Sequence, residues 1–151
     1  MGNPIFLGPD GIEVAHGHLR PAPHVDMGNP HAVAFVDDLS EVADLRDAPK
    51  VTPSWAYPDG VTVELVTARA PHHLALRVHE RGVGETPACG TGACAAAAAW
   101  RRHQQHAGPG RYIVDVPGGR LLVTAHADRG MQLTGPTAIV ADGFIPLGVI
   151  S

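Results

Sequence analysis

The sequence predicts an α+β domain in which one long helix lies among several short strands. An unbroken alanine run at 95–99 follows a glycine-rich loop, and alanine is the strongest helix former. Elsewhere apolar and polar residues alternate over short stretches, which is the pattern of half-buried strands. Glycine and proline, with 18 and 14 residues, separate these stretches as turn residues do. A chain of 151 residues is long enough for a single domain with a sizeable core.

Before the glycine-rich loop, the pattern predicts three strands and one short helix. A strand is expected over 32–36, directly after an Asn-Pro turn. Apolar residues spaced three and four apart over 39–47 predict the short helix. Alternation then predicts strands over 61–68 and 74–78, and the second of these leads into the charged pair that opens the loop.

After the loop, the long helix is expected over 91–106, because Gly108-Pro109-Gly110 stops it. Between Ala93 and Ala99 this helix offers almost no side-chain bulk. A sheet can therefore wrap it closely from several sides, so we expect it to be central. The remaining expected elements are strands over 112–116, 121–125, 131–133 and 137–140, with hairpin turns at 117–119 and 127–130.

The overall composition argues against several classes of function. The formal net charge of −4 gives no electrostatic support for binding nucleic acid or an anionic membrane. No apolar run approaches the length that spans a bilayer, and the first residues lack the regions of a secretory signal. Two cysteines are too few for a disulfide framework and suit a reducing compartment. A cytoplasmic protein is therefore expected.

The candidate chemistry lies in residues 80–94, which read ERGVGETPACGTGAC. Cys89 precedes the long helix, whose first N–H groups are unpaired and whose dipole is positive at that end. We expect this thiol to lose its proton more easily than usual, and the next three N–H groups to hold a carboxylate. The loop lacks the Gly-Lys-Ser/Thr of a phosphate loop, and Pro87 replaces the last glycine of a dinucleotide fingerprint. The alternative is a small buried cysteine without chemistry.

The second cysteine and the histidines are given no chemical role. Cys94 lies about 140° further round an ideal helix than Cys89, so the two thiols cannot readily face each other across one substrate. It is expected to be a small buried residue. The ten histidines form no recognised metal spacing, and we expect no metal site.

Several separated motifs, in the right order, resemble those of one enzyme family. Residues 80–86 and 88–93 closely resemble the second catalytic-cysteine motif of diaminopimelate epimerase. Residues 27–31, Met-Gly-Asn-Pro-His, resemble its Gly-Asn-Pro-His motif, and 117–119 and 134–136 resemble its later turns. The resemblance implies a mostly antiparallel, barrel-like sheet around one helix. Two such halves pair in the family, with the active site between them, and this chain is expected to be one domain resembling the C-terminal half.

The resemblance also implies three catalytic residues. Cys89 is expected to be the acid–base thiol, Glu80 to contact the substrate ammonium or assist a proton transfer, and His31 to support the acid–base chemistry. Removing the α-proton of an amino acid without a cofactor requires two acid–base groups, one on each face of the carbon. Cysteine suits this task because its pKa can be tuned towards neutrality. No cofactor is expected.

Substrate binding is assigned to five residues by the same resemblance. Asn29, Gly90 and Thr91 are expected to contact the substrate, and the planar fork of Arg81 suits a carboxylate. Thr62 departs from the family, which usually has asparagine in a Gly-x-Asn-Val-Glu strand to recognise the far end of diaminopimelate. Threonine keeps one donor and one acceptor but loses the reach and second donor of an amide. The identity of the substrate is thereby in question.

The expected function is cofactor-independent, two-base epimerisation of an amino-acid α-carbon. The leading substrate is diaminopimelate, converted from LL to meso in lysine and peptidoglycan biosynthesis. Nothing in the sequence resembles the first half of the family, so the N-terminal half is taken as absent, either encoded apart or removed by truncation. The expected partner is a second polypeptide, or the missing half itself, that carries the opposing cysteine, and the chain is expected to be inactive without it. The alternatives are a racemase for a different amino acid on the same scaffold, a non-catalytic binding relic, and a cysteine hydrolase, for which spacing reveals no His-Asn or His-Asp companion.

Overall fold

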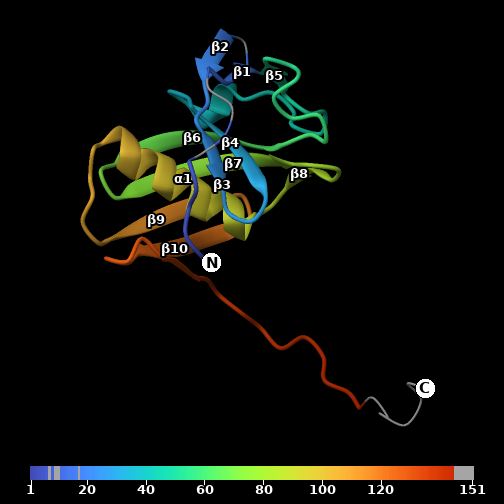
Figure 1. Ribbon diagram of the computed structural model, residues 1–151. Coiled ribbons are helices and arrows are strands. Elements are labelled where there is room, and N and C mark those ends of the chain that lie inside the picture. The colour runs from blue at the N-terminus through green and yellow to red at the C-terminus, as the bar shows by residue number, and fades with distance from the viewer. Residues whose placement is uncertain (7, 9–10, 17, 145–151) are drawn as a thin grey trace, which may run out of the picture.

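The computed structural model describes residues 1–6, 8, 11–16 and 18–144 (Figure 1). Within these ranges there is one α-helix, α1 (Gly90–His103), and one short 3₁₀ helix, η1 (Leu39–Glu41). The larger sheet contains β3 (His24–Asp26), β4 (Pro30–Phe35), β6 (Thr62–Ala70), β7 (His73–Glu80), β8 (Gly84–Thr86), β9 (Gly110–Val116), β10 (Gly119–Ala125) and β11 (Met131–Thr134). The smaller sheet contains β1 (Glu13–His16), β2 (His18–Pro21) and β5 (Lys50–Thr52). None of the helices in these ranges has the length and apolar character needed to cross a membrane.

The larger sheet has the strand order β11-β10-β9-β7-β6-β4-β3. Strand β7 pairs with two strands along the edge away from β6: its residues 73–75 pair with β9, and its residues 78–80 pair with β8. The β4–β6 and β7–β9 pairs are parallel, and the other pairs are antiparallel. Figure 1 shows the sheet curling around α1, which contacts strands from β3 to β11. The predicted α+β class is therefore confirmed: a mostly antiparallel, barrel-like sheet encloses one alanine-rich helix.

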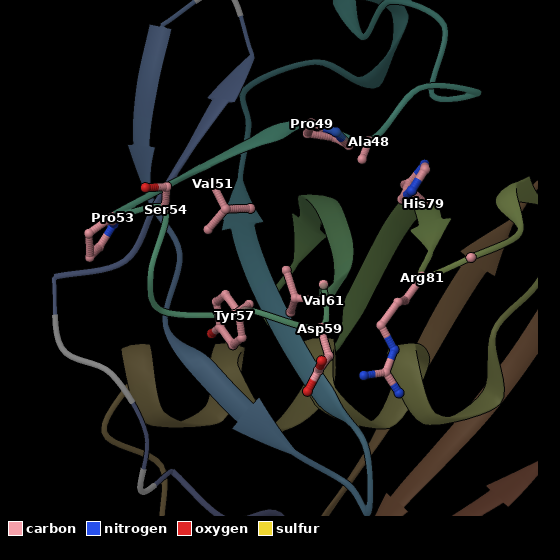
Figure 2. Close-up of a pocket in the computed structure, with 12 residues that line it drawn as sticks. Ala48, Pro49, Val51, Pro53, Ser54, Tyr57, Asp59, Val61, His79 and Arg81 are labelled. Atoms are coloured by element: carbon pink, nitrogen blue, oxygen red, sulfur yellow. The ribbon is translucent and has the colours of Figure 1, made fainter.

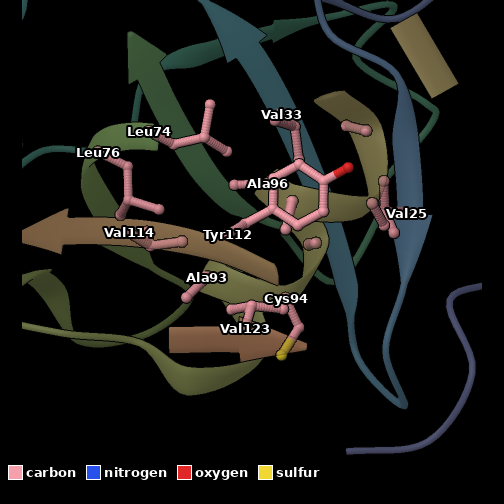
Figure 3. Packing of buried hydrophobic residues seen from close by; sticks show 14 of the residues in the cluster. Val25, Val33, Leu74, Leu76, Ala93, Cys94, Ala96, Tyr112, Val114 and Val123 are labelled. Atoms are coloured by element: carbon pink, nitrogen blue, oxygen red, sulfur yellow. The ribbon is translucent and has the colours of Figure 1, made fainter. Parts of the chain in front are cut away.

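Small side chains on α1 let the strands approach it closely. Every residue from 92 to 99 is buried. The larger apolar side chains come from the sheet, and Figure 3 shows Val33, Leu74, Tyr112 and Val123 packed around the helix. Full burial of one such aliphatic side chain stabilises the fold by about 1.5–3 kcal/mol. The sheet thus supplies most of the apolar side-chain volume of the core, and the small side chains of the helix leave room for it.

A second apolar cluster lies on the opposite face of β4 and β6. Ala32 and Ala34 of β4 and Val63 and Leu65 of β6 belong to it, whereas Val33 belongs to the cluster around α1. The small sheet and the segment after η1 contribute further apolar residues to this second cluster. Strand β4 is covered on both faces, so residues 32–35 are continuously apolar, whereas β6 places Val63 and Leu65 in this cluster and Glu64 and Val66 on the face towards α1.

The predicted helix over 39–47 is wrong, since only η1 forms there. Its carbonyl groups are engaged by other parts of the fold instead of by a helix: Arg77 Nη1 donates to the Val42 oxygen at 2.6 Å, and His79 Nδ1 lies 2.8 Å from the Leu45 oxygen. Val42 also takes an extended conformation that ends the turn. The apolar spacing that suggested a helix reflects burial of Val42 and Leu45 in the second cluster.

The predicted strand over 137–140 is also wrong. Residues 135–144 contain no strand, and Ile139 and Val140 are 92% and 94% exposed. Figure 1 shows this segment extending away from the body of the molecule after β11. A strand needs a neighbouring edge with which to pair, and no described strand lies beside this segment.

The other predicted elements are confirmed with shifted ends. The predicted strands correspond to β4, β6, β7, β9, β10 and β11, and both predicted hairpin turns connect paired strands. Helix α1 begins one residue early and ends at His103, because Gln105 adopts a left-handed φ of 55°. Strands β1, β2, β3, β5 and β8 were missed, since each has only three or four residues, too few for alternation to be recognised.

Candidate active site

Cys89 is the N-cap residue of α1. Its backbone is extended, with φ −127° and ψ 115°, and its sulfur accepts a hydrogen bond from the Gly92 amide at 3.4 Å. The Thr91 hydroxyl lies 3.4 Å from the same sulfur. The residue is 7% exposed. A thiol is thus held at the open end of the helix with two polar neighbours, in the position that the sequence predicted.

Two amides of the first helical turn remain without an acceptor in the described part of the chain, those of Gly90 and Thr91. The sequence predicted a cradle of three. The third amide, that of Gly92, instead donates to the Cys89 sulfur, and the next one, that of Ala93, donates to the Cys89 carbonyl. A carboxylate at this end of the helix would therefore meet two free N–H groups and the positive end of the dipole.

The expectation that the Cys89 thiol ionises easily is wrong for this chain. Burial raises the pKa of Cys89 above its ordinary value, and the hydrogen bonds from Thr91 and the Gly92 amide only partly counteract that effect. Glu64 or Glu80, when ionised, raises this pKa further. The helix end stabilises a thiolate, but desolvation weighs more.

The end of β7 brings Glu80, Arg81 and Thr62 together. Thr86 donates its hydroxyl proton to Glu80 Oε1 at 2.5 Å, and the Arg81 amide donates to Thr62 Oγ1 at 3.4 Å. The turn that follows needs a glycine at position 82, where φ is +78°. Arg81 is exposed, and no described carboxylate pairs with its guanidinium group.

A pocket of about 430 Å³ lies beside Arg81, as Figure 2 shows. His79 and Arg81 line one side of it, with Asp59 near Arg81, and Pro53 and Ser54 lie on the opposite side. Cys89 does not line this pocket. The cavity therefore adjoins the arginine that was expected to bind a carboxylate but does not contain the candidate acid–base thiol.

His31 and Asn29 form a hydrogen-bonded pair at the start of β4. His31 is fully buried, and its Nε2 lies 3.1 Å from Asn29 Oδ1. Its Nδ1 lies 2.6 Å from Glu64 Oε1. His31 also pairs in register with Thr62 on the neighbouring parallel strand β6. The two parts of the predicted site on β4 and β6 are thus adjacent.

Glu64 is the residue that the sequence reasoning missed. Its carboxyl group is fully buried between His31 and the first turn of α1. A Cβ atom placed on Gly92 would lie 2.5 Å from Glu64 Oε1 and 3.3 Å from the Cys89 sulfur, so the carboxyl group and the thiol flank that glycine. The available signal was an acidic residue in an otherwise apolar strand, VTVELV, because such residues are rarely buried without a partner.

Comparison with known proteins identifies one family. A model of the diaminopimelate epimerase family matches residues 24–140. The chain belongs to the diaminopimelate epimerase family. It is 50% identical over 149 residues to diaminopimelate epimerase of Streptomyces coelicolor, covering 95% of this chain and 51% of that relative. It is 42% identical over 136 residues to the enzyme of Acidothermus cellulolyticus, covering 89% and 44%.

These matches include nearly all of this chain but only about half of each relative. The chain spans about half the length of the curated relatives it matches. A solved structure of a predicted epimerase from Pseudomonas aeruginosa aligns with 87% of this chain and 41% of its own, with a TM-score of 0.46 and 13% identity.

Cys94 of this epimerase-family chain is fully buried, as predicted. Burial raises its pKa to about 11. Figure 3 shows it among the apolar side chains around α1. Within the described ranges, no group of three or more His, Cys, Asp or Glu side chains is arranged to hold a metal ion.

We expect alkylation of Cys89 by iodoacetamide to have a pH midpoint above that of a cysteine in a short unstructured peptide. A raised pKa leaves less thiolate at any given pH, and the thiolate is the nucleophile. Rates measured over a pH series, with the modified residue identified by mass spectrometry, test this. The Cys94→Ser variant should retain the profile, and a midpoint below that of the peptide would contradict the expectation.

Proposed function

We propose that this chain supplies one face of a cofactor-independent epimerase site, in which Cys89 exchanges a proton with an amino-acid α-carbon. The substrate we propose is diaminopimelate, converted from LL to meso in lysine and peptidoglycan biosynthesis. The observation that carries the proposal is the position of the Cys89 thiol next to the free amides of Gly90 and Thr91, at the positive end of α1.

The two amides would bind the α-carboxylate of the substrate. When the α-proton leaves, negative charge develops on the carboxylate oxygens. Fixed N–H donors and the helix dipole stabilise that charge without reorganising, which lowers the barrier to proton removal. Asn29 contacts His31, which contacts Glu64, and Glu64 lies beside Gly92 as the thiol does. Asn29 would add a further polar contact to the substrate.

Glu80 would contact the substrate ammonium. Its second carboxyl oxygen is not used by Thr86, which donates to Oε1. An ammonium group between Glu80 and Cys89 would offset the charge that raises the pKa of the thiol. The thiolate would then form mainly when substrate is bound, and Cys89 could remove the α-proton or return one to the same face of the carbon.

Inversion also needs an acid–base group on the opposite face. Cys94 cannot serve, since it is fully buried in the core around α1. We therefore propose that the opposing cysteine comes from the segment that corresponds to the rest of the longer relatives, on a second polypeptide. A homodimer would bring only a second copy of the same thiol motif. The extended, exposed segment 135–144 supports this proposal, because it offers apolar side chains and unpaired backbone to another chain.

The proposed location is the cytoplasm. Both cysteines are free thiols, and a mechanism that depends on Cys89 needs a compartment that keeps thiols reduced. The proposed substrate is a small soluble amino acid.

Thr62 supports a second candidate, a racemase for another amino acid. Its side chain is short and buried, and its hydroxyl oxygen already accepts the Arg81 amide. It therefore offers less to the far end of diaminopimelate than an asparagine would. The exposed guanidinium group of Arg81 stays available for a carboxylate.

The chain alone should not racemise or epimerise its substrate at any protein concentration. Addition of a polypeptide carrying the first half of the family should restore activity, because it supplies the second acid–base group. The measurement is polarimetry or chiral chromatography, with mass spectrometry of the preparation as the control for contaminating chains. Full activity of the isolated chain would refute the need for a partner.

In the complemented protein, Cys89→Ser should reduce exchange of the substrate α-hydrogen with deuterated solvent by about 10²–10⁴-fold, the contribution of one general acid–base group. Exchange is followed by mass spectrometry of the recovered substrate. The matched control is Cys94→Ser, which changes a sulfur buried in the core and should leave exchange largely intact. An inactive Cys94 variant beside an active Cys89 variant would mean that the thiols have been assigned the wrong way round.

Thr62→Asn should shift the ratio of kcat/KM towards diaminopimelate and away from amino acids that lack a second charged end. A longer amide adds reach and a second donor at this position. The Thr62→Ser variant keeps the hydroxyl and serves as the control. An unchanged ratio for the asparagine variant would remove Thr62 from substrate recognition.

A further inference from the structure

The buried carboxyl group of Glu64 has one hydrogen-bonding partner. Glu64 Oε1 lies 2.6 Å from His31 Nδ1, and both side chains are fully buried. Its other oxygen, Oε2, makes no hydrogen bond within the described part of the chain. A buried carboxylate would leave that oxygen charged and without a donor, which is costly in an apolar interior.

The hydrogen bonds of His31 restrict where the proton between these residues can lie. Asn29 presents Oδ1 to His31 Nε2 at 3.1 Å, so Nε2 is the donor in this contact, whereas an amide turned the other way would donate its NH₂ group to an unprotonated Nε2. His31 Nδ1 then either carries a second proton, making an imidazolium beside a carboxylate, or accepts a proton from a neutral Glu64. Only the second arrangement leaves both buried groups uncharged.

We propose that Glu64 is a positioning residue that carries this proton, donates it to His31 Nδ1 and so fixes His31 as the Nε2–H tautomer. The tautomer holds Asn29 Oδ1, which turns the NH₂ group of the Asn29 amide away from His31. The protonated carboxyl group of Glu64 thus fixes, through His31, the orientation of the Asn29 amide in the candidate site.

The electrostatic surroundings of the pair favour a neutral Glu64. The titratable groups facing it are Glu80 from β7, Cys89 from α1, Tyr57 from the loop before β6 and, beyond His31, His24 from β3. None of the first three is cationic. Burial raises the pKa of Glu64 by more than His31 and the Glu64 backbone amide lower it, and the charge of Glu80 acts in the same direction as burial. Tyr57 stays protonated at neutral pH, since burial is the main cause that raises its pKa to about 12.

Gly92 provides the space that this arrangement requires. Any side chain at position 92 would place its Cβ atom 2.5 Å from Glu64 Oε1, and the carboxyl group would have to move away from His31. The same glycine supplies the amide that donates to the Cys89 sulfur. A neutral Glu64 also means that, of the two carboxyl groups beside Cys89, only Glu80 opposes formation of the thiolate.

Nitrogen-15 NMR of the histidine side chains tests the location of the proton. We expect the His31 signal of the full chain at neutral pH to be that of a neutral ring protonated at Nε2. His31→Gln identifies the signal among the ten histidines. An imidazolium signal, or a neutral ring protonated at Nδ1, would overturn the proposal.

Two variants separate the donor from simple packing. Glu64→Gln has the same shape and an NH₂ donor, so it should preserve the Nε2–H tautomer. Glu64→Met fills the space without a donor, so His31 should show a mixture of tautomers. If the methionine variant does not fold, the wild-type and glutamine spectra still test whether residue 64 donates to His31. Loss of the Nε2–H tautomer in the glutamine variant would contradict a donor role.

Alkylation of Cys89 gives a second readout. Glu64→Gln should leave the pH midpoint unchanged, whereas Glu80→Gln should lower it, since it removes a charge beside the thiol. An equal lowering by both variants would show that Glu64 is ionised and refute the proposal. The relevance of Asn29 to catalysis rests on the proposed function. Absence of α-hydrogen exchange in the complemented protein would refute that function without altering either readout.

Discussion

The close approach between α1 and the sheet is the constraint on which the rest of the structure depends. Residues 92–99 carry no side chain larger than that of cysteine, so seven strands can contact one helix. Tyr112 and the aliphatic side chains of the sheet then occupy the space around it. Tightly packed interiors transmit such size requirements, since one added methylene group already disturbs them. The same helix begins at Cys89, so its placement in the sheet also fixes the position of the thiol.

The neighbouring positions of three strands explain why separate motifs meet at one end of the helix. Strands β4, β6 and β7 are adjacent in the sheet, and β4 runs parallel to β6. The beginning of β4 carries His31, the beginning of β6 carries Thr62, and the antiparallel strand β7 ends at Glu80 on the same side. Motifs that lie far apart in the sequence are thereby gathered around the first turn of α1. A substitution that shifted the β4–β6 register by one residue would turn His31 to the wrong face.

Local patterns in the sequence were sufficient where local forces decide the structure. The alanine run predicted α1, and alternation predicted β6 and β7, because both signals depend on residues close in sequence. The segment 39–47 was misjudged, since Arg77 and His79 bind carbonyl groups that a helix would have used. The sign of the Cys89 pKa shift was misjudged for a similar reason: the helix end is visible in the sequence, but the burial of the thiol is not. Glu64 stands out as an acidic residue in its strand, but its place beside Cys89 could be assigned only once β6 was known to face α1.

The exposed segment after β11 has the composition of an aggregation-prone strand. Residues 137–144 read TAIVADGF, which combines β-branched and aromatic residues, a single charge and no proline. Ile139, Val140 and Phe144 are exposed. Short segments of this kind stack edge to edge into aggregates when nothing covers them. Prepared on its own, this chain would be colloidally unstable at high concentration, and during synthesis it would be a client of chaperones that bind exposed apolar strands.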